Sequence, residues 1–297
     1  MEKVLSVPSW KEHRVASFFY DLYVSSPRPW GQIGILMLWT VLVIVTNEVF
    51  CGDGQCELTL PTSVAGSTTV ILTFLIVFRT NQAYSRYWDA RSQWGGLVTD
   101  CCALADLVSS MVKDDGIAQR IFFHIIAFPY ACKQHLRSRS LVYEELSHVL
   151  DANEVDFIDE CEWSPQAIVT LLSEDLFSDG NLPGTGYVLV GNKLAGMLKS
   201  FMCMVKIKVD GSSPAIFRIL LHMYTIIYLL VLPLSSYHDQ GRWILLTEIL
   251  TSFLMLSLQI ASSELVDPFG FDKVDLKMDK FCHVIDKMVQ QVMRSRA

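Results

Sequence analysis

Four stretches of this chain are long and apolar enough to cross a lipid bilayer, and they limit the fold more than any other feature. They run over 30–50, 58–78, 219–237 and 243–263. Inside them the only acidic residues are Glu48 and Glu248, and there is no lysine or arginine. A transmembrane helix needs about 20 mostly apolar residues, so each stretch is long enough. The sequence predicts an all-α integral membrane protein with four transmembrane helices.

The composition agrees with a membrane protein that also has a large water-facing part. Charged residues make up 19% of the chain, against about 25% in an ordinary soluble domain. A net charge of only -7 with 51% hydrophobic residues excludes a disordered chain. Because 24 lysines and arginines face 31 acidic residues, no basic excess is left for a nucleic-acid binder.

Basic residues predict how the spans are oriented. Segment 51–57 has none, and segment 235–242 has only Arg242. The basic residues near the opposite span ends are Lys11, Arg14, Arg28, Arg79, Arg86, Arg91, Lys199, Lys206, Lys208 and Arg218. Short cytoplasmic segments carry the excess of lysine and arginine. We therefore expect both termini and the middle region on the cytoplasmic or stromal side, in a plasma membrane or an organelle membrane such as the thylakoid.

The spans divide the chain into five predicted parts. These are an amphipathic cytosolic segment (1–29), the first two spans (30–78), a cytosolic helical domain (79–214), the last two spans (215–265) and a cytosolic C-terminal segment (266–297). The helical pattern of the second span continues to about residue 112, which predicts one helix about 70 Å long at 1.5 Å per residue. Further helices are expected over 117–137, 140–152, 165–177, 187–208 and 275–295.

The second span has an unusual composition for a helix that faces lipid. Its hydroxyl residues are Thr59, Thr62, Ser63, Ser67, Thr68, Thr69 and Thr73. Val70, Phe74 and Phe78 follow at i, i+4 and i+8, so they share one helix face. Such a stripe is usually a packing surface between helices. The alternative is a hydrophobic constriction that lines a pore and closes by dewetting.

Three ordered blocks of the chain resemble the bestrophin family and its bacterial and plant relatives. The blocks are FRTNQAYSRYWDARSQWG at 78–95, SPAIFRILLHMYTIIYLLVLPLSSYHDQGRW at 213–243 and SSELVDPFGFDKVDLKMDKFCHVID at 262–286. Over residues 110–210 the chain resembles that family only in its pattern of predicted helices. The residues that carry the resemblance include Arg79, Asn81, Tyr84, Arg86, Trp88, Arg91, Asp267, Pro268, Phe269 and Gly270.

The resemblance implies a homopentameric ion channel whose central pore is lined by the second span of each subunit. It places the hydrophobic neck at Val70, Phe74 and Phe78. Pro61, Thr62 and Ser63 lie at the outer start of the pore helix and are the candidate entrance residues. The segment from Arg79 to Arg91 would anchor the pore helix at the cytoplasmic boundary. The cytosolic vestibule of the family ends in a second aperture, for which Val188 and Val190 are the candidates here.

Anions are the expected permeant species. The edges of aromatic rings are positive, and the positive end of the pore-helix dipole lies at the entrance. Chloride, nitrate or bicarbonate would therefore be favoured. A monovalent-cation channel of the bacterial type and a non-conducting membrane scaffold are the alternatives.

Neither a metal nor a cofactor is expected. Lys273 and Lys277 interrupt the acidic run that follows the Asp-Pro pair in calcium-gated members of the family, so little Ca²⁺ dependence is predicted. The eight carboxylates of 144–162 include no glycine bend of a calcium loop, which favours a solvated surface. No nucleotide-binding loop, zinc-protease motif or nucleophile elbow occurs, so the chain is not expected to be an enzyme.

Four further residues are candidates for a functional or structural role. Glu248 and His222 lie inside predicted spans, where ionisable side chains often mark a functional site. The alternative is a neutral side chain hydrogen-bonded to a neighbouring helix. Cys51 and Cys56 flank the outer loop and could form a disulfide if that side is oxidising.

Overall fold

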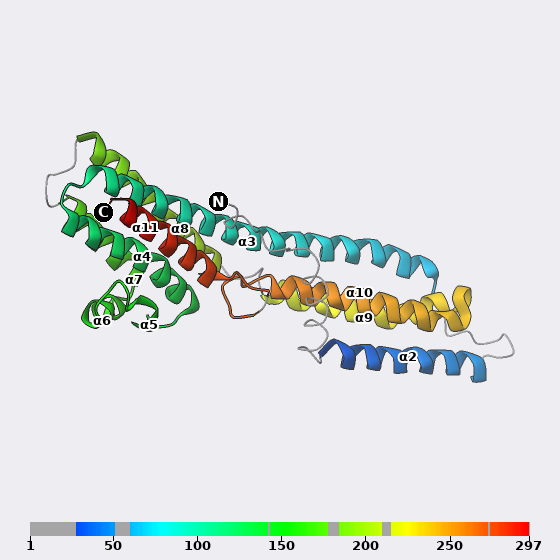
Figure 1. Ribbon diagram of the computed structural model, residues 1–297. Helices are drawn as coiled ribbons and strands as arrows, with labels where there is room; N and C mark the ends of the chain where they lie inside the picture. Colours follow the sequence, from blue (N-terminus) through cyan, green and yellow to red (C-terminus); the bar gives the residue numbers. More distant parts are fainter. Residues whose placement is uncertain are drawn as a thin grey trace, which may run out of the picture. The chain divides into compact units, whose positions relative to one another are not determined.

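The computed structural model describes residues 28–50, 60–141, 143–177, 184–209, 215–272 and 274–296. Every regular element in these ranges is helical, which confirms the all-α class (Figure 1). The elements are α2 (Arg28–Phe50), α3 (Thr62–Met111), α4 (Asp115–Arg137), α5 (Tyr143–Leu146), α6 (Ala152–Glu160), α7 (Ser164–Phe177), α8 (Gly184–Val209), α9 (Ala215–Gln240), η1 (Gly241–Trp243), α10 (Ile244–Glu264) and α11 (Met278–Arg296).

These elements form two units. Unit 1 comprises the described residues of Met1–Ser85 and Ser212–Val266, and unit 2 those of Arg86–Gly211 and Asp267–Ala297. Unit 1 therefore holds α2, the first part of α3, α9, η1 and α10. Unit 2 holds the rest of α3, α4 to α8 and α11.

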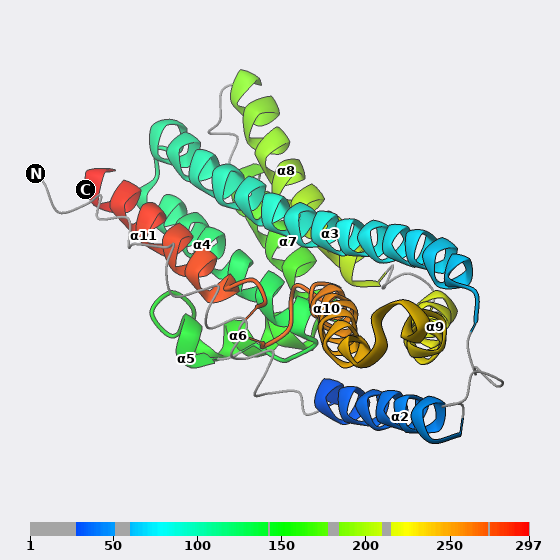
Figure 2. The ribbon, with the colours of Figure 1, turned by 90° about the vertical axis from the view of Figure 1, so that its right-hand side faces the viewer.

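In unit 1, helices α2, α9 and α10 lie side by side (Figure 2). Their shared core includes Leu36, Leu229 and Leu256, and α3 adds Leu72 and Ile76 to it. The outward faces of these helices are also apolar. The exposed large side chains include Ile35, Leu38, Leu42, Ile219, Leu220, Met223, Leu250 and Leu254. Apolar surface on both the inside and the outside is typical of helices that cross a membrane.

Length and composition identify four helical segments that could span a bilayer. They are Trp30–Val49, Thr62–Met111, Gly184–Val209 and Ile216–Glu264. The last contains both α9 and α10, which are the predicted third and fourth spans. Gly184–Val209 is α8, which the sequence pattern assigned to the cytosolic domain. One face of α8 is buried in the core of unit 2 through residues such as Met197 and Phe201, which favours the assignment to the helical domain.

Helix α3 has 50 residues and confirms the single long helix expected from the unbroken pattern. At 1.5 Å per residue it is about 75 Å long. It begins at Thr62 rather than at residue 58, directly after Pro61. The preceding Leu60 donates its backbone N–H to the carbonyl of Leu234 at 2.9 Å, so the start of α3 is fixed to α9.

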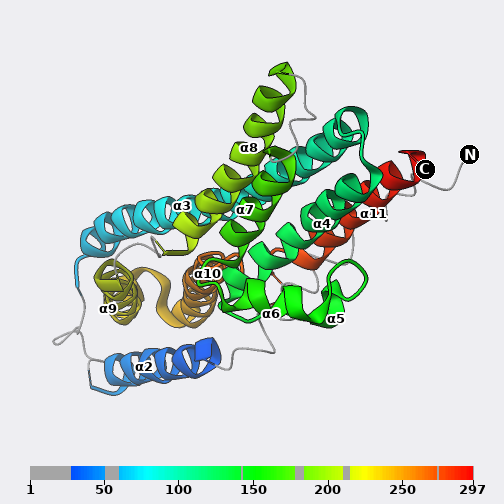
Figure 3. The same cartoon turned by 90° about the vertical axis from the view of Figure 1, so that its left-hand side faces the viewer.

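In unit 2, α4 packs against α7 and α11 (Figure 3). The side-chain oxygen of Asp114 caps α4 by accepting the N–H groups of Gly116 and Ile117 at 2.8 and 3.1 Å. The fully buried Trp94 ring stacks on the partly buried Phe281 ring, with ring centroids 5.6 Å apart.

The prediction of a single helix over 140–152 is wrong. The described part of this segment forms the short α5 and a turn, and α6 starts afresh at Ala152. Asp151 precedes α6 with an extended backbone, and its N–H donates to the Glu154 carboxylate at 3.3 Å. An aspartate with a glutamate three residues later is a helix-start signal, and it divides the segment.

Candidate functional site

Val70, Phe74 and Phe78 lie on the face of α3 that the subunit leaves uncovered. Their side chains are 70%, 69% and 50% exposed, whereas Leu72 and Ile76 are buried. A helix turns 100° per residue, so the stripe is opposite the packed face. The rings of Phe74 and Phe78 stack with centroids 6.4 Å apart. Packing within one subunit therefore does not explain the stripe.

The predicted entrance residues occupy the first turn of α3. Pro61, Thr62 and Ser63 are exposed, and the Pro61 carbonyl accepts the N–H of Val64 at 3.0 Å. The hydroxyl groups that follow bond back to their own helix. Ser67 donates to the Ser63 carbonyl at 2.5 Å. Thr68 and Thr69 also donate to backbone carbonyls one turn earlier, and the Thr69 hydroxyl lies 2.9 Å from the Tyr228 hydroxyl of α9.

The predicted boundary motif has one packed side and one exposed side. Arg79 is 6% exposed. Arg86, two turns later, donates through Nη2 to the Ile207 carbonyl at 2.5 Å. The exposed side is formed by Asn81, Tyr84, Trp88 and Arg91. The Arg91 guanidinium lies 5.9 Å from the centre of the Trp88 ring.

The Asp267-Pro268-Phe269-Gly270 signature forms a compact turn in unit 2. The Asp267 carboxylate accepts the N–H of Phe269 at 3.1 Å, and the Pro268 carbonyl accepts the N–H of Leu276 at 3.0 Å. The Phe269 side chain is buried in the core. This turn orders the chain ahead of α11. The described residues contain no group of three or more His, Cys, Asp or Glu that could hold a metal ion.

One of the two aperture candidates is corrected. Val190 is fully buried in the core of unit 2, so its side chain cannot line an opening. Val188 is 63% exposed and stays a prediction. The two residues are 200° apart around α8, which is why they cannot share one lining face. Cys51 and Cys56 lie outside the described residues.

The two ionisable side chains inside the spans have different surroundings. His222 contacts a neighbouring helix, because its Nδ1 lies 2.9 Å from Oε1 of Gln259 on α10. Glu248 is fully buried in unit 1. Neither of its carboxylate oxygens has a hydrogen-bond partner among the described residues.

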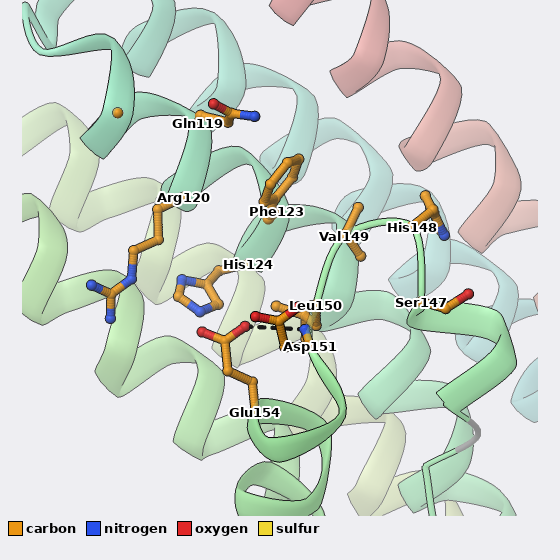
Figure 4. A pocket seen from close by; sticks show the side chains of 11 residues that line it. Gln119, Arg120, Phe123, His124, Ser147, His148, Val149, Leu150, Asp151 and Glu154 are labelled. Carbon is orange, nitrogen blue, oxygen red and sulfur yellow. Dashed lines mark hydrogen bonds between the residues drawn. The ribbon is translucent and has the colours of Figure 1, made fainter.

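A cavity of about 440 Å³ opens in unit 2 beside α4 and the start of α6 (Figure 4). His124 faces it from α4, and Glu154 faces it from α6. Burial lowers the pKa of His124, while the nearby Asp175 carboxylate opposes this shift. Nδ1 of His124 and Nε of Arg120 both lie 3.4 Å from Asp175 Oδ2. The walls carry both signs of charge, because Arg120, Asp151 and Glu154 all line the cavity.

Comparison with known proteins identifies the family. The family described as "Bacterial/Fungal Bestrophin protein" matches the sequence over residues 26–291. Proteins of Nostoc and Synechocystis, both named voltage-dependent anion channel-forming proteins, are 24% and 23% identical to the chain. These two matches cover 89% and 94% of the chain, and 92% and 96% of the relatives.

Solved structures share the fold. A bacterial bestrophin homolog from Klebsiella pneumoniae is 20% identical, with a TM-score of 0.79 over 89% of this chain and 97% of that one. A substituted form of the homolog gives a TM-score of 0.81 at 19% identity, over 89% and 98% of the two chains. The chain is a multi-pass membrane protein and belongs to the bacterial and fungal bestrophin family.

Proposed function

We propose that this chain is the subunit of a homopentameric anion channel whose ion pathway follows the stripe of Val70, Phe74 and Phe78. The observation that carries this proposal is the exposure of these apolar side chains opposite the packed face of α3. The printed names of the curated relatives, which describe anion channel-forming proteins, support the choice of activity.

The chemistry of the stripe explains how such a pathway would work. Five copies of α3 around one axis would place five Phe74 and five Phe78 rings at a neck. An apolar neck closes when water leaves it, and it conducts when it widens enough to be wetted. Aromatic edges are positive, and the N-terminus of α3 directs its positive dipole end to the entrance. Both features favour chloride, nitrate or bicarbonate over a cation.

The basic residues near the span ends support the orientation. They favour a cytoplasmic or stromal position for both termini and for the helical domain of unit 2. That domain would then surround a vestibule on the same side as Arg79. Val188 is the residue we propose at its narrow end.

The experiment that tests this function is the reversal potential of the purified protein in a planar bilayer under a KCl gradient. We expect reversal near the chloride equilibrium potential, with no change on adding micromolar Ca²⁺. Reversal near the potassium potential would replace the proposal by the cation channel. Protein that inserts but passes no current at any voltage would favour the scaffold.

A further inference from the structure

A small cavity of about 180 Å³ lies within unit 1, at the end of the helices opposite η1. All four spanning helices of the unit contribute to its wall. The lining residues are Gln32, Arg79, Arg218, His222, Leu256, Gln259, Ile260 and Ser263. Two of them are arginines and none is an acid. The cavity is therefore cationic.

The two arginines lack a protein counter-charge. Neither guanidinium has a hydrogen bond or ion pair with another described residue. The charge of Arg218 acts unfavourably on Arg79, which is 6% exposed. Arg218 is exposed at the rim of the cavity, and arginine does not lose its proton in a protein. An anion in the cavity would offset the repulsion between the two guanidinium groups.

The polar wall of the cavity is held in place by a chain of contacts across three helices. Gln32 Nε2 lies 3.4 Å from His222 Nε2, and His222 Nδ1 lies 2.9 Å from Gln259 Oε1. The amide nitrogen of Gln259 donates to the Thr225 hydroxyl, which donates to the Leu221 carbonyl at 2.8 Å. The two arginines supply the permanent positive charge of the cavity, because a guanidinium keeps its proton in a protein.

We propose that this cavity binds a phosphate group, supplied either by free phosphate or by the headgroup of an anionic lipid. Guanidinium groups form paired hydrogen bonds with the oxygens of phosphate. The cavity is several times larger than the space of one water, which is about 30 Å³. Exposed apolar residues Ile219 and Leu220 follow Arg218 directly. Basic pockets between helices at the edge of the apolar zone are suited to lipid headgroups.

Binding to the purified full chain in detergent and chloride-free buffer tests this proposal without any current measurement. The probes for isothermal titration calorimetry are inorganic phosphate, dioctanoyl phosphatidylglycerol and zwitterionic dioctanoyl phosphatidylcholine. We expect the two anionic probes to bind more tightly than the zwitterion. Tighter binding of phosphatidylglycerol than of phosphate would identify a lipid headgroup as the source. Equal affinity would identify free phosphate.

The substitution Arg218→Gln keeps the exposed position polar and removes one charge. We expect it to weaken binding of the anionic probes at least about tenfold, because hydrogen bonds to charged groups carry that much free energy. Arg294→Gln, at an exposed position of α11, is the matched control and should bind as the wild type does. The absence of binding to the wild type would overturn the proposal. So would equal affinities of the Arg218→Gln variant and the wild type.

Discussion

At the scale of single residues, exposure separates side chains that hold the subunit together from those left to face a pore, a lipid or a neighbour. Phe74 and Ile76 are two residues apart, yet the first is 69% exposed and the second is buried. Val188 and Val190 differ in the same way. A sequence gives the period of such a pattern, but it does not say which face packs inside the subunit. That information came from the partners of α3 and α8.

Gly270 is a residue whose replacement should destabilise unit 2. A Cβ at this position would lie 2.5 Å from Oδ2 of Asp275, and that oxygen accepts the N–H of Asp272 at 2.8 Å. We expect Gly270→Ala to lower the free energy of unfolding by about 1–3 kcal/mol through this overlap. Thermal unfolding in detergent measures it. Gly95→Ala, where a Cβ meets nothing within 4 Å, is the control and should be neutral or stabilising. Equal melting temperatures of Gly270→Ala and wild type would refute the overlap.

At the scale of elements, the helices were largely predictable and the cavities were not. The 50 residues of α3 followed from a stretch without a helix breaker. The break after α5 is harder to predict, because the Asp151–Glu154 helix-start signal competes with the helical pattern of 140–152. The phosphate cavity joins Gln32, Arg79, Arg218 and Gln259, which are far apart in the chain. Only the packing of four helices brings them together.

Lys133 links three elements of unit 2. It is 1% exposed on α4, and its Nζ lies 2.5 Å from Glu145 Oε2 and 2.9 Å from Asp279 Oδ1. Glu145 belongs to α5 and Asp279 to α11. Burial alone would lower the pKa of Lys133, but the hydrogen bonds to the two carboxylates raise it. The lysine is therefore charged and depends on both acids.

Removing the lysine and removing the two acids should lower the free energy of unfolding by different amounts. Lys133→Met leaves two carboxylates that water can reach, and should cost about 1–3 kcal/mol of unfolding free energy. The double change Glu145→Gln with Asp279→Asn leaves a buried ammonium without a counter-charge, and should cost about 3–5 kcal/mol. Thermal unfolding of both variants makes the comparison. A larger loss for Lys133→Met would contradict the network.

The same network predicts a pH dependence. Burial would raise the pKa of Asp279, but the hydrogen bond and charge of Lys133 lower it below the usual value. A carboxyl with a lowered folded pKa stabilises the fold above its unfolded pKa of about 3.9, and this contribution is lost as the pH falls through the folded value. The stability difference between wild type and Asp279→Asn should therefore shrink on acidification below about pH 4. A difference that stays constant over this range would show that the ion pair contributes nothing.

At the scale of the whole molecule, the proposal requires five subunits. A single chain leaves the apolar face of α3 open, and five copies of α3 around one axis would cover it. Native mass spectrometry of the protein released from detergent should give a mass of five copies of the 33.6 kDa chain. A monomer or dimer as the dominant species would exclude a pore made by five α3 helices.

The measurement that most directly tests the ion pathway is the single-channel conductance of a neck variant. Phe74→Ala with Phe78→Ala removes two rings from each subunit and should raise conductance several-fold, with weaker closing, because a wider apolar neck is wetted more easily. Leu38→Ala with Leu42→Ala makes the same truncation at exposed positions of α2 and should leave conductance unchanged. If the neck variant conducts as the wild type does, or if both pairs change conductance equally, the pathway does not follow the stripe of α3.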